Sequence, residues 1–187
     1  MRVIAGKAKG CPLKAVPGMG TRPTTDKVKE AIFSMIGPYF DRGNVLDLFA
    51  GTGGMGIEAL SRGMTKGIFV DIERKSIDVI SFNLERSRLT DLAEVYRNDA
   101  ERALHVLGKR GIHFDLIILD PPYHQDVITK LLMLIDQKNL LSNDGMIVLE
   151  YGKSNEIDVD ENRFHFHKQV NYGDTTVAIV EKVDVQI

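Results

Sequence analysis

Short apolar runs alternate along the chain with segments in which apolar residues recur at helical spacing. Such alternation is typical of α/β proteins, in which helices cover a mostly parallel sheet. In the helix that follows the second run, Ile77, Ile80, Leu84 and Leu92 form an approximate apolar stripe, and Ser76 belongs to the side expected to face water. The expected strands cover residues 45–49, 67–71, 94–98, 114–119 and 146–151.

Two further β-like segments, residues 163–172 and 175–182, flank Gly173-Asp174 near the C-terminal end. A glycine-containing pair between two such segments predicts a tight turn, and therefore an antiparallel hairpin. We expect this hairpin at the far edge of the sheet, which then has seven strands.

The first part of the chain follows a different pattern. Residues 2–14 contain short β-like stretches broken by glycine and proline, so they predict a hairpin or a loop. Thr24 or Thr25 can cap a following helix, because threonine oxygens accept hydrogen bonds from free backbone N–H groups. Apolar residues then recur at helical spacing, so this helix is expected to dock on the core. They are Val28, Ile32, Phe33 and Ile36.

Length and composition exclude several classes of protein. The 187 residues, 43% of them hydrophobic, suit one domain with one substantial core. No apolar run approaches the roughly 20 residues that cross a bilayer, so we expect a soluble, cytoplasmic protein without a membrane segment. The only cysteine, Cys11, excludes an internal disulfide. His165 and His167 share a face of an expected strand, but the five histidines lack the spacing of a closed metal site, and no metal is expected.

Charge is distributed unevenly, although the net charge is only -2. Residues 1–42 hold eight basic and three acidic side chains, whereas the rest of the chain holds 16 basic and 23 acidic ones. A basic end on an otherwise acidic chain favours contact with a polyanion through that end alone. A flexible, solvated terminus with chance lysines explains the same numbers equally well. The candidate nucleic-acid contacts are Arg2, Lys7, Lys9, Lys14, Arg22 and Thr24.

A glycine loop joins the first expected strand to the following helix. Gly51, Gly53 and Gly56 follow the G-x-G-x-x-G spacing, and Asp71, at the end of the second strand, stands 20 residues after Gly51. Such glycines allow a sharp turn and a close approach of a ligand to backbone N–H groups, and the acid can accept hydrogen bonds from ribose hydroxyls. The loop therefore indicates an adenosine cofactor, either NAD or S-adenosylmethionine.

Residues at successive strand ends share one crevice in an open α/β sheet. Asp99 follows the third strand and is placed either to accept a hydrogen bond from adenine or to cap the next helix. The residues expected to bind the cofactor are Asp47, Phe49, Ala50, Gly51, Thr52, Gly53, Asp71, Ile72, Asn98, Asp99, Ala100 and Asp120.

The sequence Asp120-Pro121-Pro122-Tyr123 ends the fourth strand and fits methylation of a planar amine. The lone pair of such an amine is delocalised, so the enzyme must orient the nitrogen and accept its N–H groups. Asp120 can do this and stabilise the positive charge that develops. The two prolines fix the backbone, and Tyr123 offers a flat face to an unstacked base. We therefore predict that these four residues are catalytic, with S-adenosylmethionine as the cofactor.

The residues at positions 45–53, Asp71 and residues 120–123 resemble those of class I amino-methyltransferases. The sequences at 22–33 and 172–176 narrow this likeness to the bacterial 16S ribosomal RNA guanine-N2 methyltransferase family, across essentially the whole chain. The resemblance implies a Rossmann-like, seven-stranded, mostly parallel sheet with a C-terminal antiparallel hairpin and a small N-terminal hairpin and helix. It also implies a monomer that methylates N2 of one guanine, guanine 966, in 16S RNA or the 30S subunit.

On this interpretation residues 1–42 form a basic extension docked on the core, and residues 43–187 form the methyltransferase domain. A DNA adenine-N6 methyltransferase is a rival interpretation, although 187 residues leave no room for a separate target-recognition domain. A protein-glutamine methyltransferase is disfavoured by Asp rather than Asn at position 120. An NAD-dependent oxidoreductase gives the Asp-Pro-Pro-Tyr motif no role, and a noncatalytic RNA-binding module remains a further alternative.

Overall fold

A computed structural model describes residues 1–18, 25–122, 125–155 and 157–183. The helices are α1 (Asp26–Ile36), α2 (Gly54–Ser61), α3 (Arg74–Arg86), α4 (Ala100–Arg110) and α5 (Gln125–Gln137), with a short 3-10 helix at Thr90–Leu92. The strands are β1 (Asn44–Asp47), β2 (Lys66–Asp71), β3 (Ala93–Arg97), β4 (Phe114–Leu119), β5 (Leu141–Gly152), β6 (Phe164–Tyr172) and β7 (Thr175–Lys182). None of the described helices is long and apolar enough to span a membrane.

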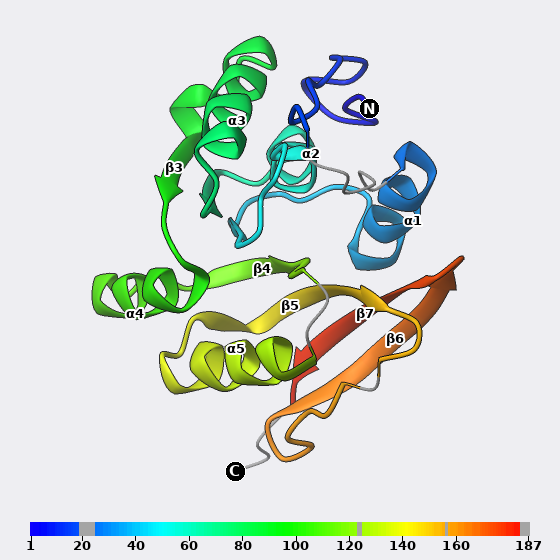
Figure 1. The fold of residues 1–187 in the computed structure, drawn as a ribbon, viewed down its shortest axis with the longest axis vertical. Coiled ribbons are helices and arrows are strands. Elements are labelled where there is room, and N and C mark those ends of the chain that lie inside the picture. The colour runs from blue at the N-terminus through cyan, green and yellow to red at the C-terminus, as the bar shows by residue number, and fades with distance from the viewer. Residues whose placement is uncertain (19–24, 123–124, 156, 184–187) are drawn as a thin grey trace.

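The seven strands form one sheet in the order β3-β2-β1-β4-β5-β7-β6 (Figure 1). Strands β1 to β5 run parallel, whereas β7 lies antiparallel between β5 and β6. The predicted α/β class, the mostly parallel sheet and the C-terminal hairpin are therefore confirmed. The chain passes from β1 outward to β3 and then returns to start β4 on the other side of β1. In open α/β sheets this switch of direction marks the crevice in which ligands bind.

Helices cover both faces of the sheet, because successive residues of each strand point to opposite faces. Val45 and Leu116 belong to a core on the face that carries α1, α2 and α3. Leu46 and Ile117 belong to a second core on the face that carries α4 and α5. Figure 1 shows these two layers on either side of the sheet.

Some predicted boundaries were wrong. Strand β5 begins at Leu141 rather than at residue 146, because Leu141 pairs with Phe114 before an irregularity in the β4 ladder. The polar residues after Leu141 do not form an apolar run, so the sequence pattern did not predict this part of the strand. Ser76 is fully buried rather than solvated, and Leu92 lies in the 3-10 helix beyond the end of α3.

The N-terminal segment forms a narrow hairpin with one isolated bridge between Arg2 and Pro12. The backbone N–H of Val3 donates to the carbonyl of Cys11 at 2.9 Å. Thr25 caps α1 by accepting a hydrogen bond from the backbone N–H of Val28 at 3.3 Å, whereas Thr24 lies outside the described residues. The predicted hairpin-and-helix extension is therefore present, and its apolar residues share the core of the α1–α3 face.

Candidate active site

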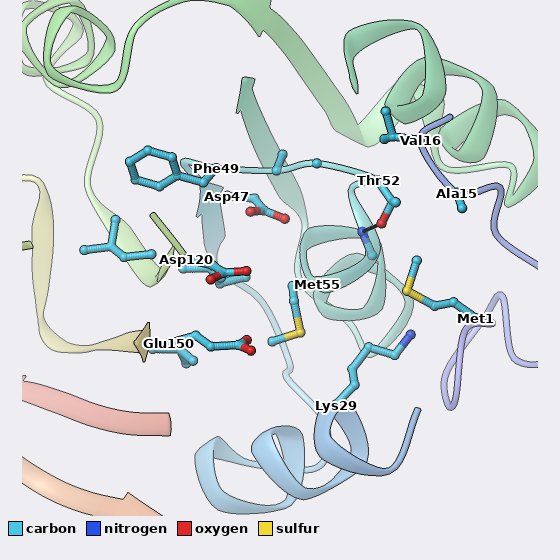
Figure 2. A pocket seen from close by; sticks show the side chains of 16 residues that line it. Met1, Ala15, Val16, Lys29, Asp47, Phe49, Thr52, Met55, Asp120 and Glu150 are labelled. Carbon is cyan, nitrogen blue, oxygen red and sulfur yellow. Dashed lines mark hydrogen bonds between the residues drawn. The ribbon is translucent and has the colours of Figure 1, made fainter. Parts of the chain in front are cut away.

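A cavity of about 190 Å³ opens at the C-terminal ends of β1 and β4, where the chain changes direction. Pockets that hold a whole drug-sized ligand are larger, about 300–1,000 Å³, so this space suits the reacting parts of two ligands rather than a complete nucleoside cofactor. Figure 2 shows side chains from several elements pointing into it. Its lining consists of Met1, Ala15, Val16, Lys29, Asp47, Phe49, Ala50, Gly51, Thr52, Gly54, Met55, Ile118, Leu119, Asp120, Val148 and Glu150.

The glycine loop between β1 and α2 forms one side of this cavity. Gly51 and Gly53 have φ angles of +54° and +75°, which residues with a side chain rarely adopt. At Gly56, a Cβ atom would lie 2.4 Å from Cε1 of Phe69, so only glycine lets α2 pack this closely on β2. The loop therefore turns sharply and brings the N-terminus of α2 to the cavity.

Two carboxylates hold the loop in shape. Asp47 accepts a hydrogen bond from the backbone N–H of Gly56 at 3.0 Å, and Asp71 accepts one from Gly51 at 2.8 Å. Burial raises the pKa of Asp47 to about 7, against the lowering effect of its bond from Gly56. Asp71 thus joins the end of β2 to the loop.

The other predicted cofactor residues lie in different places. Phe49, Ala50, Thr52 and Asp120 line the cavity with Asp47 and Gly51, and Gly53 belongs to the same loop. Ile72 is the first residue after β2, and 59% of its surface is exposed, which is unusual for a large apolar residue. Asn98 lines a second cavity of about 220 Å³ between β3 and α4. Asp99 accepts hydrogen bonds from the backbone of Glu101 and Arg102, which makes it the N-cap of α4, and Ala100 is the first residue of that helix.

Asp120 immediately follows β4 and points into the crevice beside Glu150 (Figure 2). It keeps contact with solvent through the mouth of the cavity while protein surrounds it on the other sides. Loss of hydration to this surrounding protein raises its pKa above the usual range, and the charges of Glu150 and then Asp47 add to the effect. Pro121 is buried and Pro122 is exposed. Tyr123 lies outside the described residues.

The N-terminal hairpin forms the opposite wall through Met1, Ala15 and Val16. A buried carboxylate in α2 holds this hairpin in place: Glu58 accepts hydrogen bonds from the backbone N–H groups of Ile4 at 2.8 Å and Ala5 at 3.0 Å. Asn83 of α3 provides a second anchor, because its side-chain oxygen accepts a hydrogen bond from the backbone N–H of Lys14 at 2.7 Å.

Lys29 of α1 connects this wall to the cavity. It is fully buried, forms an ion pair with Glu58 at 3.3 Å and donates a hydrogen bond to the carbonyl of Arg2 at 2.5 Å. Burial lowers the pKa of Lys29, and the negative charge of Glu58 opposes this effect. Lys29 is one of the eight basic residues of the N-terminal segment. Because it is buried and paired with Glu58, it belongs to the scaffold rather than to an exposed basic surface.

The remaining basic candidates lie on the outside of the hairpin. Lys7 and Lys9 are exposed. Arg2 forms an exposed ion pair with Asp26 at 3.5 Å, and the ammonium group of Lys14 lies 5.1 Å from the centre of the Phe82 ring. Arg22 and Thr24 lie outside the described residues.

His165 and His167 share an exposed face of the hairpin, as their spacing predicts. The structure adds Glu181 of β7, whose carboxylate lies 3.4 Å from His165 and 3.3 Å from His167. This group lies near the start of β5 in the register of the sheet, at the opposite end from the crevice.

Sequence reasoning missed the cavity residues Lys29 and Glu150 and the anchor Glu58. The available signal was their type and position: a charged residue stands among the apolar positions of α1 and of α2, and Glu150 follows an apolar run as Asp120 does.

The sheet order, the glycine loop and the acid at the end of β4 together define a Rossmann-like methyltransferase. The solved structure of yhhF from Escherichia coli is similar to this chain, with a TM-score of 0.84 and 26% identity over 97% of each chain.

The chain belongs to the ribosomal RNA small subunit methyltransferase D family, whose sequence model, described as conserved hypothetical protein 95, matches residues 1–181. YlbH of Bacillus subtilis is 54% identical over 182 residues, which cover 97% of this chain and 99% of YlbH. Ribosomal RNA small subunit methyltransferase D of Buchnera aphidicola is 32% identical over 90% of this chain and 86% of its own length.

Proposed function

We propose that this protein transfers a methyl group from S-adenosylmethionine to the N2 amine of a guanine in 16S ribosomal RNA of the small ribosomal subunit, at guanine 966. The observation that carries this proposal is the position of Asp120, with Pro121 and Pro122, at the end of β4 beside the glycine loop. Family membership supports ribosomal RNA as the substrate, since the named relative methylates the small-subunit RNA.

The residues present fit the cofactor. Gly51 lines the cavity and has no atom within 4 Å of the place a Cβ would take, so a ligand can approach its backbone. Asp71 and the exposed Ile72 offer a carboxylate for ribose hydroxyls and an apolar surface for adenine, and Asn98, Asp99 and Ala100 stand at the neighbouring strand end. When bound, S-adenosylmethionine supplies a methyl group on a positively charged sulfur.

The protein's own contribution to the chemistry is to orient the amine. Asp120 accepts a hydrogen bond from an N–H of the amine. This contact draws the lone pair, which is otherwise delocalised into the ring, back onto the nitrogen. The nitrogen would exchange one N–H bond for a bond to the methyl group, which leaves a neutral thioether as its bond to sulfur breaks, and the proton would pass to water through the open mouth of the cavity. Because holding reactants in place can lower a barrier by roughly 7–11 kcal/mol, no strong general base is needed.

The exposed basic residues of the N-terminal hairpin would contact the RNA backbone. Lys7, Lys9 and Lys14 are exposed on the segment that also forms one wall of the cavity. Phosphate contacts position a nucleic acid without reading its sequence, so this extension would hold the RNA while the cavity receives the base. We expect the protein to act as a monomer in the cytoplasm, on 16S RNA or on the 30S subunit.

The test uses the Asp120→Ala variant with labelled S-adenosylmethionine and, separately, naked 16S RNA, undermethylated 30S particles and duplex DNA. We expect wild-type protein to form N2-methylguanosine in RNA and the variant to lose roughly 100-fold or more of this activity while it still binds the cofactor. Asp144→Ala, at an exposed position near the start of β5, is the matched control and should keep full activity. Unchanged turnover in Asp120→Ala, or label in N6-methyladenine of DNA, would refute the proposal.

A further inference from the structure

Glu150 stands beside Asp120 because of the register between β4 and β5. Ile118 pairs with Val148 and Leu119 pairs with Leu149, so the next residues along the two parallel strands are Asp120 and Glu150. Paired residues of neighbouring parallel strands point to the same face, about 4.8 Å apart. Both acids line the cavity, and Figure 2 shows both side chains directed into the same space.

Asp47, Thr52 and Lys29 also line the cavity. Asp47 and Thr52 accept hydrogen bonds from the backbone of the glycine loop, and Lys29 is paired with Glu58. Among the polar groups that line the cavity, Asp120 and Glu150 form a pair of neighbouring carboxylates, which are hydrogen-bond acceptors when ionised.

Such a pair matches one base in particular. The pairing edge of guanine carries two adjacent kinds of donor, the N1–H and the N2 amine. Adenine and cytosine carry an amine next to a ring nitrogen that is an acceptor, so a second carboxylate would face a lone pair. A base removed from its stack is read through hydrogen bonds to this edge.

We propose that Glu150 accepts the N1–H of the target guanine while Asp120 holds its N2 amine, and that Glu150 thereby selects guanine. This assignment rests on the proposed function, because it names how the same cavity recognises its base. The close pair of like charges is consistent with it, since Glu150 contributes to the raised pKa of Asp120. Donors from the guanine edge stabilise the ionised form of both acids and so offset their mutual repulsion.

The experiment compares guanine with 2-aminopurine at the methylated position of reconstituted 30S particles. The analogue keeps the 2-amine but has an acceptor instead of N1–H. Wild-type protein should prefer guanine by roughly 10- to 100-fold in kcat/KM, because loss of a matched donor leaves a carboxylate facing a lone pair. In Glu150→Gln the amide can donate to N1 of the analogue, so the preference should shrink to about threefold or less.

Glu161→Gln is the matched control, because Glu161 is exposed and precedes β6 at the opposite end of the sheet. This variant should keep the wild-type preference. If Glu150→Gln lowers the rates on both particles by the same factor, the residue has only a structural role and the assignment is wrong. If wild-type protein forms no N2-methylguanosine at all, the proposed function fails, and this assignment fails with it.

Discussion

Replacement of Glu58 by glutamine tests whether the N-terminal hairpin is held in place by one buried carboxylate. Glu58 is fully buried and accepts hydrogen bonds from the backbone N–H groups of Ile4 and Ala5. It also forms ion pairs with the Arg62 guanidinium at 2.8 Å and the Lys29 ammonium at 3.3 Å. All four donors therefore converge on the two oxygens of one side chain.

The expected effect is large because glutamine has only one acceptor oxygen and no charge. Two buried cations, Lys29 and Arg62, would lose their counter-charge, and solvent cannot screen them at this depth. Removal of one partner of a buried ion pair typically costs about 3–5 kcal/mol. We expect Glu58→Gln to lower the free energy of unfolding by this amount and to release the hairpin locally.

Two measurements check this prediction: urea unfolding for the free energy, and hydrogen exchange at the amides of Ile4 and Ala5 for the local release. Asp78→Asn is the control, since Asp78 forms an i,i+4 pair with Arg74 in which both side chains are mostly exposed, and such pairs contribute about 0–1 kcal/mol. A loss of less than about 1 kcal/mol in Glu58→Gln with unchanged protection of both amides would show that apolar packing alone holds the hairpin.

Two further predictions concern charge. Burial raises the pKa of Asp47 in the folded protein to about 7, above its ordinary value of 3.8. Between these two values the folded protein keeps the proton on Asp47 whereas the unfolded chain loses it. The free energy of unfolding that Asp47 contributes therefore falls as the pH rises from about 4 to about 7. Urea unfolding across this pH range should show Asp47→Asn gaining stability over wild type as the pH rises, and a constant difference would contradict the burial argument. Lys7→Ser and Lys9→Ser should each weaken binding to 16S RNA and lower the slope of log affinity against log salt by about 1, whereas an unchanged slope would place these residues away from the phosphates.

The sheet was predictable because its signals are local. Strands β2, β4 and β5 each contain an apolar run long enough to recognise, and Gly173-Asp174 marks the turn between β6 and β7. The start of β5 was not predictable, since Leu141 is followed by polar residues and its strand pairing depends on Phe114, far away in the chain. Ser76 was predicted to face solvent, because serine is mostly exposed in proteins, yet it is completely buried where α3 packs on the sheet.

The candidate site likewise contains some residues that the sequence predicts and others that it does not. The glycine loop, Asp71 and Asp120 are recognisable because each has a fixed place relative to a strand end. Glu150 has no motif of its own, and its importance depends on the register that sets it beside Asp120. Lys29 looks like part of a basic segment, and only the packing of α1 against α2 shows that its charge is directed inward, to Glu58.

The distribution of charge around the crevice indicates how RNA would enter it. Asp47, Asp120 and Glu150 concentrate acidic groups inside the cavity, which disfavours phosphate there. Lys7 and Lys9 are exposed on the hairpin that also forms the cavity wall, and there they would attract phosphate. Acidic groups inside the cavity and basic groups on the hairpin would therefore hold the RNA backbone outside, while an unstacked base presents its donor groups to Asp120 and Glu150. One segment would thus serve both contacts, because the hairpin that carries the lysines also forms one wall of the cavity.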